Sequence, residues 1–65
     1  MKILTWQVRN RKKVTLVELS KLAGISKSTL NNIDNEKVSP IIKQLEAIAK
    51  ALDVRINDLY ESPYK

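Results

Sequence analysis

The chain contains no cysteine, no histidine and no phenylalanine, and it has only one glycine and two prolines among 65 residues. Without cysteine it forms neither a disulfide nor a thiolate metal site. Without histidine it lacks the commonest metal ligand and the usual general base of enzymes. No paired carboxylates and no nucleophile–base combination stand out. The sequence therefore predicts a protein that is not an enzyme and that uses no metal and no cofactor.

Long apolar segments are also missing. The longest uninterrupted apolar run covers residues 47–49, far short of the ~20 residues that a membrane-spanning helix needs. The first residues hold no apolar stretch long enough for a signal peptide. We therefore expect a cytoplasmic protein that makes no membrane contact. A chain of 65 residues has room for one small domain, so we expect residues 1–65 to form it without a separate effector domain for a small molecule.

Positive charge is concentrated in one half of the chain. The whole sequence has 12 Lys and Arg against 7 Asp and Glu, a net charge of +5. Residues 1–37 hold eight basic and three acidic side chains, whereas residues 38–65 hold four of each. A basic half favours a surface that contacts a polyanion, because phosphate contacts release condensed counterions. On charge alone, a solvated surface that keeps a small protein soluble explains the pattern equally well.

Apolar side chains recur one helical turn apart along most of the chain, which predicts an all-α fold with no strand. Leu4 and Val8 place the first helix, and the widest apolar stripe lies in the fourth. Ser39 and Pro40 suit the N-cap and first residue of that fourth helix, and Asp53 can end it. The five predicted helices lie near residues 3–12, 16–23, 27–35, 41–52 and 56–61.

The stretch from Thr15 to Asn35 has the layout of two short helices joined by a tight turn. Thr15 and Glu18 have the spacing of a capping box at the start of the first of these helices. Gly24, the only glycine, falls where that helix should end, and it can adopt a left-handed backbone conformation there. Ser26 is a good N-cap for the next helix. Two helices around a single glycine are the arrangement of a helix-turn-helix.

The second helix of this pair exposes polar side chains if Leu30 and Ile33 face the core. Asparagine pairs bidentately with adenine, lysine donates to guanine, and serine bonds to either. Asparagine is also a poor helix former, so two adjacent asparagines on an exposed face favour a functional use over a purely structural one. The residues that we predict to contact bases are Lys27, Ser28, Asn31 and Asn32.

With these positions in place, the sequence resembles the lambda-repressor-like family of helix-turn-helix regulators, of the Cro and xenobiotic-response-element type. The resemblance implies a five-helix domain whose third helix enters the major groove of double-stranded DNA, usually as a homodimer on a palindromic operator. It runs from about Val8 to Tyr60. The landmarks are Val8-Arg9, Val14-Thr15, Glu18-Leu19, Ala23-Gly24-Ile25-Ser26, Thr29-Leu30, Ile33-Asp34-Asn35, Pro40, Leu45, Ile48-Ala49-Lys50-Ala51-Leu52 and Asp58-Leu59-Tyr60.

The resemblance also implies roles for individual residues. It pairs Arg9 with Asp34, an ion pair that holds the third helix against the first, and it makes Gly24 structural. Lys13, at the basic end of the first helix, either contacts a phosphate or stabilises the negative end of that helix. The residues that we predict to contact phosphates are Ser26, Asn35, Lys37 and Lys13.

Three residues depart from the family pattern. Leu16 replaces a glutamine that commonly donates to a phosphate at the start of the second helix. Glu36 replaces a glycine after Asn35, which places a negative charge on the expected phosphate side and requires a turn without glycine. Arg55 replaces the usual serine or threonine cap of the last helix, which should therefore be less well started.

Taken together, the sequence predicts a sequence-specific, double-stranded-DNA-binding transcriptional regulator, a repressor that acts as a homodimer by occupying its operator. The alternative is a protein-interaction or antitoxin-like module that uses the same fold to bind a partner protein. Leu16 and Glu36 favour this alternative slightly, because both weaken phosphate contact. Tyr60 and Tyr64 lie either at the edge of the core or in a dimer contact.

Overall fold

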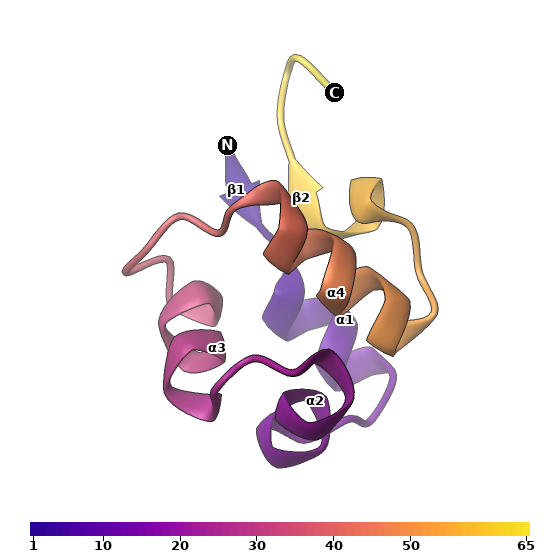
Figure 1. Cartoon of the computed structure of the whole chain (residues 1–65). Helices are drawn as coiled ribbons and strands as arrows, with labels where there is room; N and C mark the ends of the chain where they lie inside the picture. The colour runs from indigo at the N-terminus through magenta and orange to yellow at the C-terminus, as the bar shows by residue number, and fades with distance from the viewer.

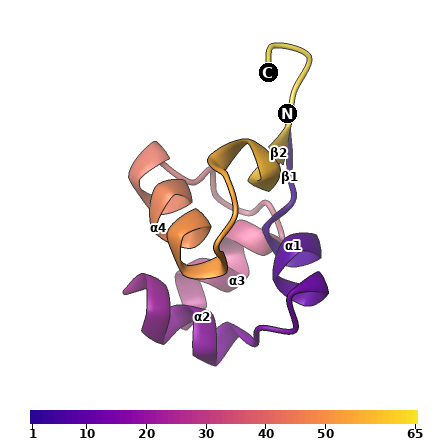
Figure 2. The ribbon, with the colours of Figure 1, turned by 90° about the vertical axis from the view of Figure 1, so that its right-hand side faces the viewer.

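A computed structural model describes all 65 residues as four α-helices, a short 3₁₀ helix and two very short strands (Figure 1). The two termini lie at one end of the molecule and α2 lies at the other, as Figures 1 and 2 both show. No helix combines the length and the apolar character needed to cross a bilayer. In chain order the elements are β1 (Lys2–Ile3), α1 (Thr5–Arg11), α2 (Leu16–Ala23), α3 (Lys27–Asp34), α4 (Ile42–Leu52), the 3₁₀ helix η1 (Ile56–Leu59) and β2 (Tyr60–Glu61).

One apolar core joins all the helices. Helix α2 packs against both α3 and α4, and α1 packs against α3, α4 and η1. Helices α3 and α4 contribute buried apolar residues spaced one turn apart, as their sequence periodicity predicts, whereas α1 and α2 contribute one such residue each. The nine buried apolar residues of the core are Val8, Leu19, Leu30, Ile33, Leu45, Ile48, Ala49, Leu52 and Leu59.

The ends of the helices largely follow the predicted signals. Thr15 and Glu18 form the capping box of α2: the Glu18 backbone N–H donates to the Thr15 hydroxyl at 3.1 Å, and the Thr15 N–H donates to the Glu18 carboxylate at 3.2 Å. Gly24 ends α2 with φ 70°, and Asp53 ends α4 with φ 56°. These local signals hold because each is satisfied within one turn of the chain.

The start of α4 differs from the prediction. The N-cap is Ile41 and the helix begins at Ile42, so Ser39 is not the cap and Pro40 is not the first helical residue. No side chain caps the first N–H groups of the helix, but Gln44 Oε1 accepts from the Ile41 N–H at 3.1 Å. This is the half of a capping box in which the side chain of the third helical residue bonds back to the N-cap backbone.

The two ends of the chain contradict the prediction of five α-helices and no strand. Residues 2–3 form β1, which pairs antiparallel with β2, so that Ile3 lies opposite Tyr60. The fifth helix is therefore only the 3₁₀ turn of η1, which β2 follows directly, and α1 begins at Thr5 rather than near residue 3. The Asp58 carboxylate accepts from the Arg55 N–H at 3.0 Å and starts this turn without a serine or threonine cap.

Candidate nucleic-acid interface

The corner between α2 and α3 is held by one glycine and one serine. Gly24 lies in the left-handed region, and its N–H donates to the Ser20 carbonyl at 3.0 Å. The Ser20 hydroxyl then donates to the Ile25 carbonyl on the far side of the corner at 2.7 Å. The small Ser20 side chain thus bridges the two ends of the turn.

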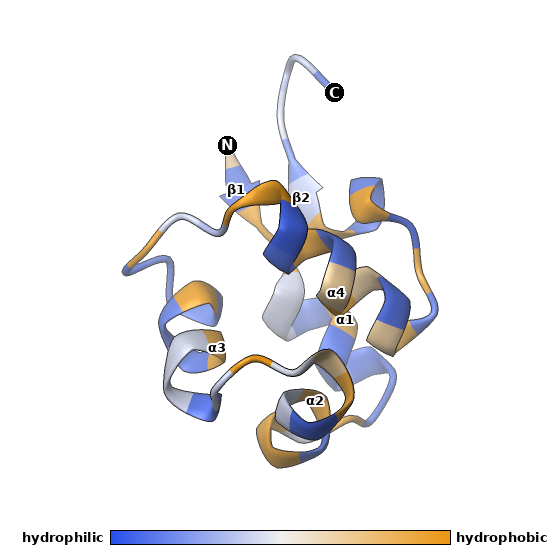
Figure 3. Cartoon of the chain, in the orientation of Figure 1, coloured by the Kyte–Doolittle hydropathy of each residue, from blue (hydrophilic) through white to orange (hydrophobic).

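Helix α3 divides into a buried and a polar face. Ser26 is its N-cap, accepting from the Thr29 N–H at 3.2 Å. Leu30 and Ile33 are fully buried in the core, and α3 is drawn mostly in white and blue in Figure 3. The remaining face presents hydroxyl, amide and ammonium groups to solvent, which are the groups that read base edges in a major groove.

A buried polar network fastens the end of α3 to α1. Arg9 Nη2 lies 3.1 Å from Asp34 Oδ2, and the side chains are only 11% and 5% exposed. The Thr5 hydroxyl donates to the other carboxylate oxygen of Asp34 at 2.6 Å. Arg9 Nη1 also donates to the Val14 carbonyl at 3.0 Å, which ties the loop after α1 to the same network. The predicted Arg9–Asp34 pair is therefore present.

Thr5 is the member of this network that the sequence analysis missed. It is 1% exposed and stands four residues before Arg9, on the same face of α1. The available signal was that spacing, because residues four apart on a helix are neighbours. Arg9 Nε is buried without a hydrogen-bond partner, so the guanidinium is held by two of its three nitrogens.

The loop after α3 carries Asn35, Glu36 and Lys37. The Lys37 N–H donates to the Asn32 carbonyl at 2.9 Å, and the lysine side chain is exposed. Glu36 adopts φ 57°, so the turn expected of a glycine is made here by a strained glutamate. Its carboxylate accepts from the Ile3 N–H at 2.7 Å. The negative charge that we expected to face phosphates is thus engaged with β1.

The predicted contact residues differ in how free their side chains are. All eight lie at the surface, but Asn32 is only partly exposed. The Asn35 amide nitrogen donates to the Asn31 carbonyl at 3.0 Å and lies 3.4 Å from the Asn31 side-chain oxygen. The Ser26 hydroxyl is occupied as a cap and donates to the Thr29 hydroxyl at 2.8 Å. The exposed residues among the eight are Lys13, Ser26, Lys27, Ser28, Asn31, Asn35 and Lys37.

Positive charge also gathers where α1 ends and α2 begins. Arg11, Lys12 and Lys13 are exposed in succession, and Lys13 adopts φ 58° immediately before the loop to α2. Leu16, the first residue of α2, is partly buried against the core. Phosphate contact at this helix start would therefore use backbone N–H groups and the neighbouring lysines. No group of three or more His, Cys, Asp or Glu side chains is placed to hold a metal ion.

Comparisons with known proteins agree with this geometry. Residues 6–63 match the model of the family described as the Cro/C1-type HTH DNA-binding domain. The chain is 34% identical over 50 residues to the immunity repressor protein of Bacillus phage phi105, covering 77% of this chain and 35% of the repressor. It is 40% identical over 52 residues to the SPbeta prophage-derived uncharacterized HTH-type transcriptional regulator YopS of Bacillus subtilis, covering 78% of this chain and 70% of that protein. The chain thus spans about a third of the phage repressor's length.

Proposed function

The chain belongs to the Cro/C1-type helix-turn-helix DNA-binding family, and on that premise we propose that it binds a specific double-stranded DNA sequence and represses transcription by occupying it. The two relatives are named as a repressor and as a transcriptional regulator, which supports this assignment. The same membership agrees with the expectation that the chain is not an enzyme. The observation that carries the proposal is the polar face of α3, which stands outward from a core that holds Leu30 and Ile33.

In this mechanism α3 lies in the major groove and reads base edges. Asn32 and Lys27 are the first candidates for base contact, since an asparagine amide matches adenine and a lysine ammonium matches guanine. Ser28 and Asn31 are the next candidates. The polar network around Asp34 supports this use, because it fixes the C-terminal end of the reading helix to α1.

Phosphate contacts then set the register of α3 in the groove. We assign them to Lys13 beside the start of α2, to Ser26 at the start of α3, and to Asn35 and Lys37 in the loop after α3. These residues flank both ends of the reading helix. Phosphate contacts position a protein on the duplex, whereas base contacts select the sequence.

The regulator acts as a homodimer on a palindromic operator. A second copy related by two-fold symmetry places its α3 in the next major groove, one helical turn or about 34 Å away. Two half-sites then contribute to one binding event, which raises both affinity and specificity above those of one small domain.

Selection of bound sites from a random duplex library tests the proposal. We expect enrichment of two inverted half-sites whose centres lie about 10 base pairs apart. On the selected site, log K should fall with log salt at a slope of roughly −4, if Lys13 and Lys37 of each subunit neutralise one phosphate each. Recovery of no motif, or binding that is independent of salt, contradicts sequence-specific DNA recognition. A motif with a single half-site contradicts the dimer.

A further inference from the structure

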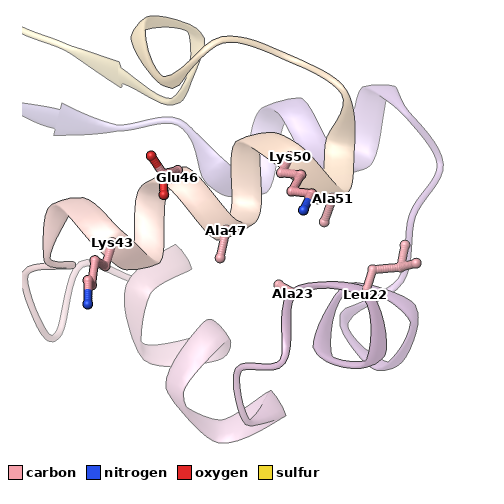
Figure 4. A pocket seen from close by; sticks show the side chains of 7 residues that line it. All are labelled: Leu22, Ala23, Lys43, Glu46, Ala47, Lys50 and Ala51. Carbon is pink, nitrogen blue, oxygen red and sulfur yellow. The ribbon is translucent and has the colours of Figure 1, made fainter.

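A shallow groove of about 500 Å³ runs between α2 and α4, on a part of the surface that no residue of α3 lines (Figure 4). DNA recognition by α3 leaves this groove unused. Seven side chains line it, two from α2 and five from α4: Leu22, Ala23, Lys43, Glu46, Ala47, Lys50 and Ala51.

The floor of the groove consists of small apolar side chains. Ala23, Ala47 and Ala51 contribute only methyl groups, so another helix can approach α4 closely there, within the 8–10 Å that separates packed helix axes. Leu22 forms one wall and is 64% exposed, although it belongs to a helix whose neighbouring Leu19 is fully buried. A large exposed apolar side chain beside a groove is a feature of surfaces that bind another molecule.

Two lysines flank the floor without an acidic partner. Lys43 and Lys50 are seven residues apart on α4, about 10 Å along the helix axis. The salt bridges of the molecule are Arg9–Asp34 and Lys65–Glu61, so neither groove lysine is in an ion pair. Glu46 lies between the two lysines on α4 and also lines the groove. In Figure 4 the ammonium ends of Lys43 and Lys50 point down from α4, whereas the Glu46 carboxylate points up. The groove therefore presents an apolar floor edged by two lysines outside any ion pair and by one glutamate, an excess of positive charge.

From this pattern we infer that the groove binds an acidic amphipathic helix of a partner protein. An apolar stripe of such a helix would cover the alanines and Leu22, while acidic residues two turns apart would reach Lys43 and Lys50. DNA fits poorly, because phosphates gain nothing from an alanine floor. A second copy of the chain fits poorly as well, because its own groove would bring the same two lysines against Lys43 and Lys50.

This inference goes beyond DNA binding, because a partner bound in the groove could control the helix-turn-helix. Helix α2 is one of the two helices of the helix-turn-helix, so a partner in the groove rests on the element that carries the α2–α3 corner. The partner is thereby defined by chemistry: a helix with an apolar stripe and two acidic residues two turns apart beside it.

The test uses a fluorescein-labelled helical peptide of roughly 15 residues with a leucine stripe at i, i+4 spacing and two glutamates two turns apart. A matched peptide replaces the two glutamates by lysines. We expect saturable binding of the glutamate peptide to the full chain, measured by fluorescence polarisation, and none of the lysine peptide. Equal affinity for both peptides, or no saturable binding, would overturn the inference.

Charge-reversal variants locate the contact. Lys43→Glu/Lys50→Glu should weaken the glutamate peptide by about tenfold and create binding of the lysine peptide. The matched control Lys2→Glu/Arg55→Glu removes the same net charge at exposed positions outside the groove, and it should leave the affinity within about twofold. Equal losses in the two variants mean nonspecific attraction and contradict the inference.

A third variant separates this inference from the proposed function. Ala47→Gln fills the floor and leaves both lysines in place, and we expect it to weaken the glutamate peptide by about tenfold. Affinity for the selected DNA site and the thermal unfolding temperature should stay unchanged, which shows that the domain is folded. Unchanged peptide binding by Ala47→Gln contradicts the inference. If sedimentation shows that the parent chain self-associates and that Ala47→Gln abolishes this, the occupant of the groove is a second copy, which also contradicts the inference.

Discussion

Single residues with unusual backbone conformations end every α-helix of this domain. Gly24 follows α2 with φ 70°, and Lys13, Glu36 and Asp53 follow the other helices with φ of 58°, 57° and 56°. The left-handed conformation costs a residue other than glycine roughly 1–2 kcal/mol. Only one of the four positions carries glycine, so the other three store some strain. Gly24 and Asp53 turn the chain between elements that pack together, α2 with α3 and α4 with η1.

Gly24→Ala isolates the cost of this conformation. Nothing lies within 4 Å of the position that a Cβ would occupy, so the alanine meets no steric clash and only the backbone penalty remains. We expect a loss of about 1 kcal/mol in the free energy of unfolding, measured by urea denaturation. Gly24→Asn is the matched control and should cost less, because asparagine tolerates the left-handed conformation. Equal costs for Ala and Asn contradict this account.

Asn32→Ala tests the reading of bases. If the Asn32 amide pairs with a base edge, its removal should lower affinity for the selected operator by about 1–3 kcal/mol and leave affinity for random duplex unchanged. Fluorescence anisotropy on both duplexes measures the difference. The partial exposure of Asn32 makes this a demanding test, and equal losses on both duplexes remove Asn32 from the set of base contacts.

Lys37→Ala tests a phosphate contact by the opposite pattern. Its exposed ammonium lies in the loop after α3, and a phosphate carries no sequence information. We therefore expect affinity to fall by a similar factor on every duplex, and the salt slope to flatten by about one for each lysine removed. Salt titrations of the variant and the parent chain, on the operator and on random DNA, measure both effects. A loss confined to the operator assigns Lys37 to base reading instead.

Between elements, the contact that positions α3 is polar, although the rest of the core is apolar. One carboxylate oxygen of Asp34 accepts from Arg9 Nη2 at 3.1 Å, and the other accepts from the Thr5 hydroxyl at 2.6 Å. Arg9 also holds the carbonyl of Val14. The network therefore joins three segments: α1, α3 and, through Arg9, the loop at Val14. Such a network has directional bonds, and it fixes the rotation of α3 about its axis more tightly than apolar packing alone.

Asp34→Ala should destabilise the domain by about 3–5 kcal/mol, because it leaves the Arg9 charge buried without a partner. Urea denaturation measures this loss. The double variant Arg9→Met/Asp34→Leu should recover most of it, since replacing both charges by apolar groups removes the desolvation cost. Glu61→Ala is the control, because it breaks an ion pair whose side chains are 30% and 65% exposed, and it should cost less than about 0.5 kcal/mol. A small loss for Asp34→Ala contradicts the role of this network.

For the molecule as a whole, stability depends on a core of nine apolar residues. A domain this small buries only ~60% of the surface that its unfolded chain exposes, so its reserve of stability is small. Each fully buried leucine therefore matters to the entire fold. The exposed apolar residues, in contrast, are available to partners at little cost to folding.

Leu19 and Leu22 make a matched pair on one helix for testing this division. Leu19 is 0% exposed and Leu22 is 64% exposed. Leu19→Ala leaves a cavity in the core and should cost about 2–5 kcal/mol, enough to unfold much of the population. Leu22→Ala should change the free energy of unfolding by less than about 0.5 kcal/mol. Circular dichroism during thermal unfolding distinguishes the two, and similar losses in both variants contradict the described burial.

Local chemistry made most of the helical framework predictable from the amino-acid sequence. The capping box of Thr15 and Glu18, the left-handed Gly24 and the apolar periodicity each act within a turn or two of the chain, and α2 was predicted with its observed bounds. The exposed polar face of α3 followed from the same periodicity. The family resemblance added the Arg9–Asp34 pair, which joins residues too distant in sequence for spacing to reveal.

Contacts between distant segments decided the rest. The pairing of β1 with β2, the bond from Ile3 to Glu36 and the buried Thr5 all join residues more than 25 positions apart. The composition of residues 2–3 or 60–61 does not predict a strand, because a strand exists only where another segment pairs with its backbone N–H and C=O groups. The groove between α2 and α4 likewise exists only because the two helices pack side by side. Short-range hydrogen bonding and periodic burial thus shaped the helices, while long-range packing set the ends of the chain and the groove between α2 and α4.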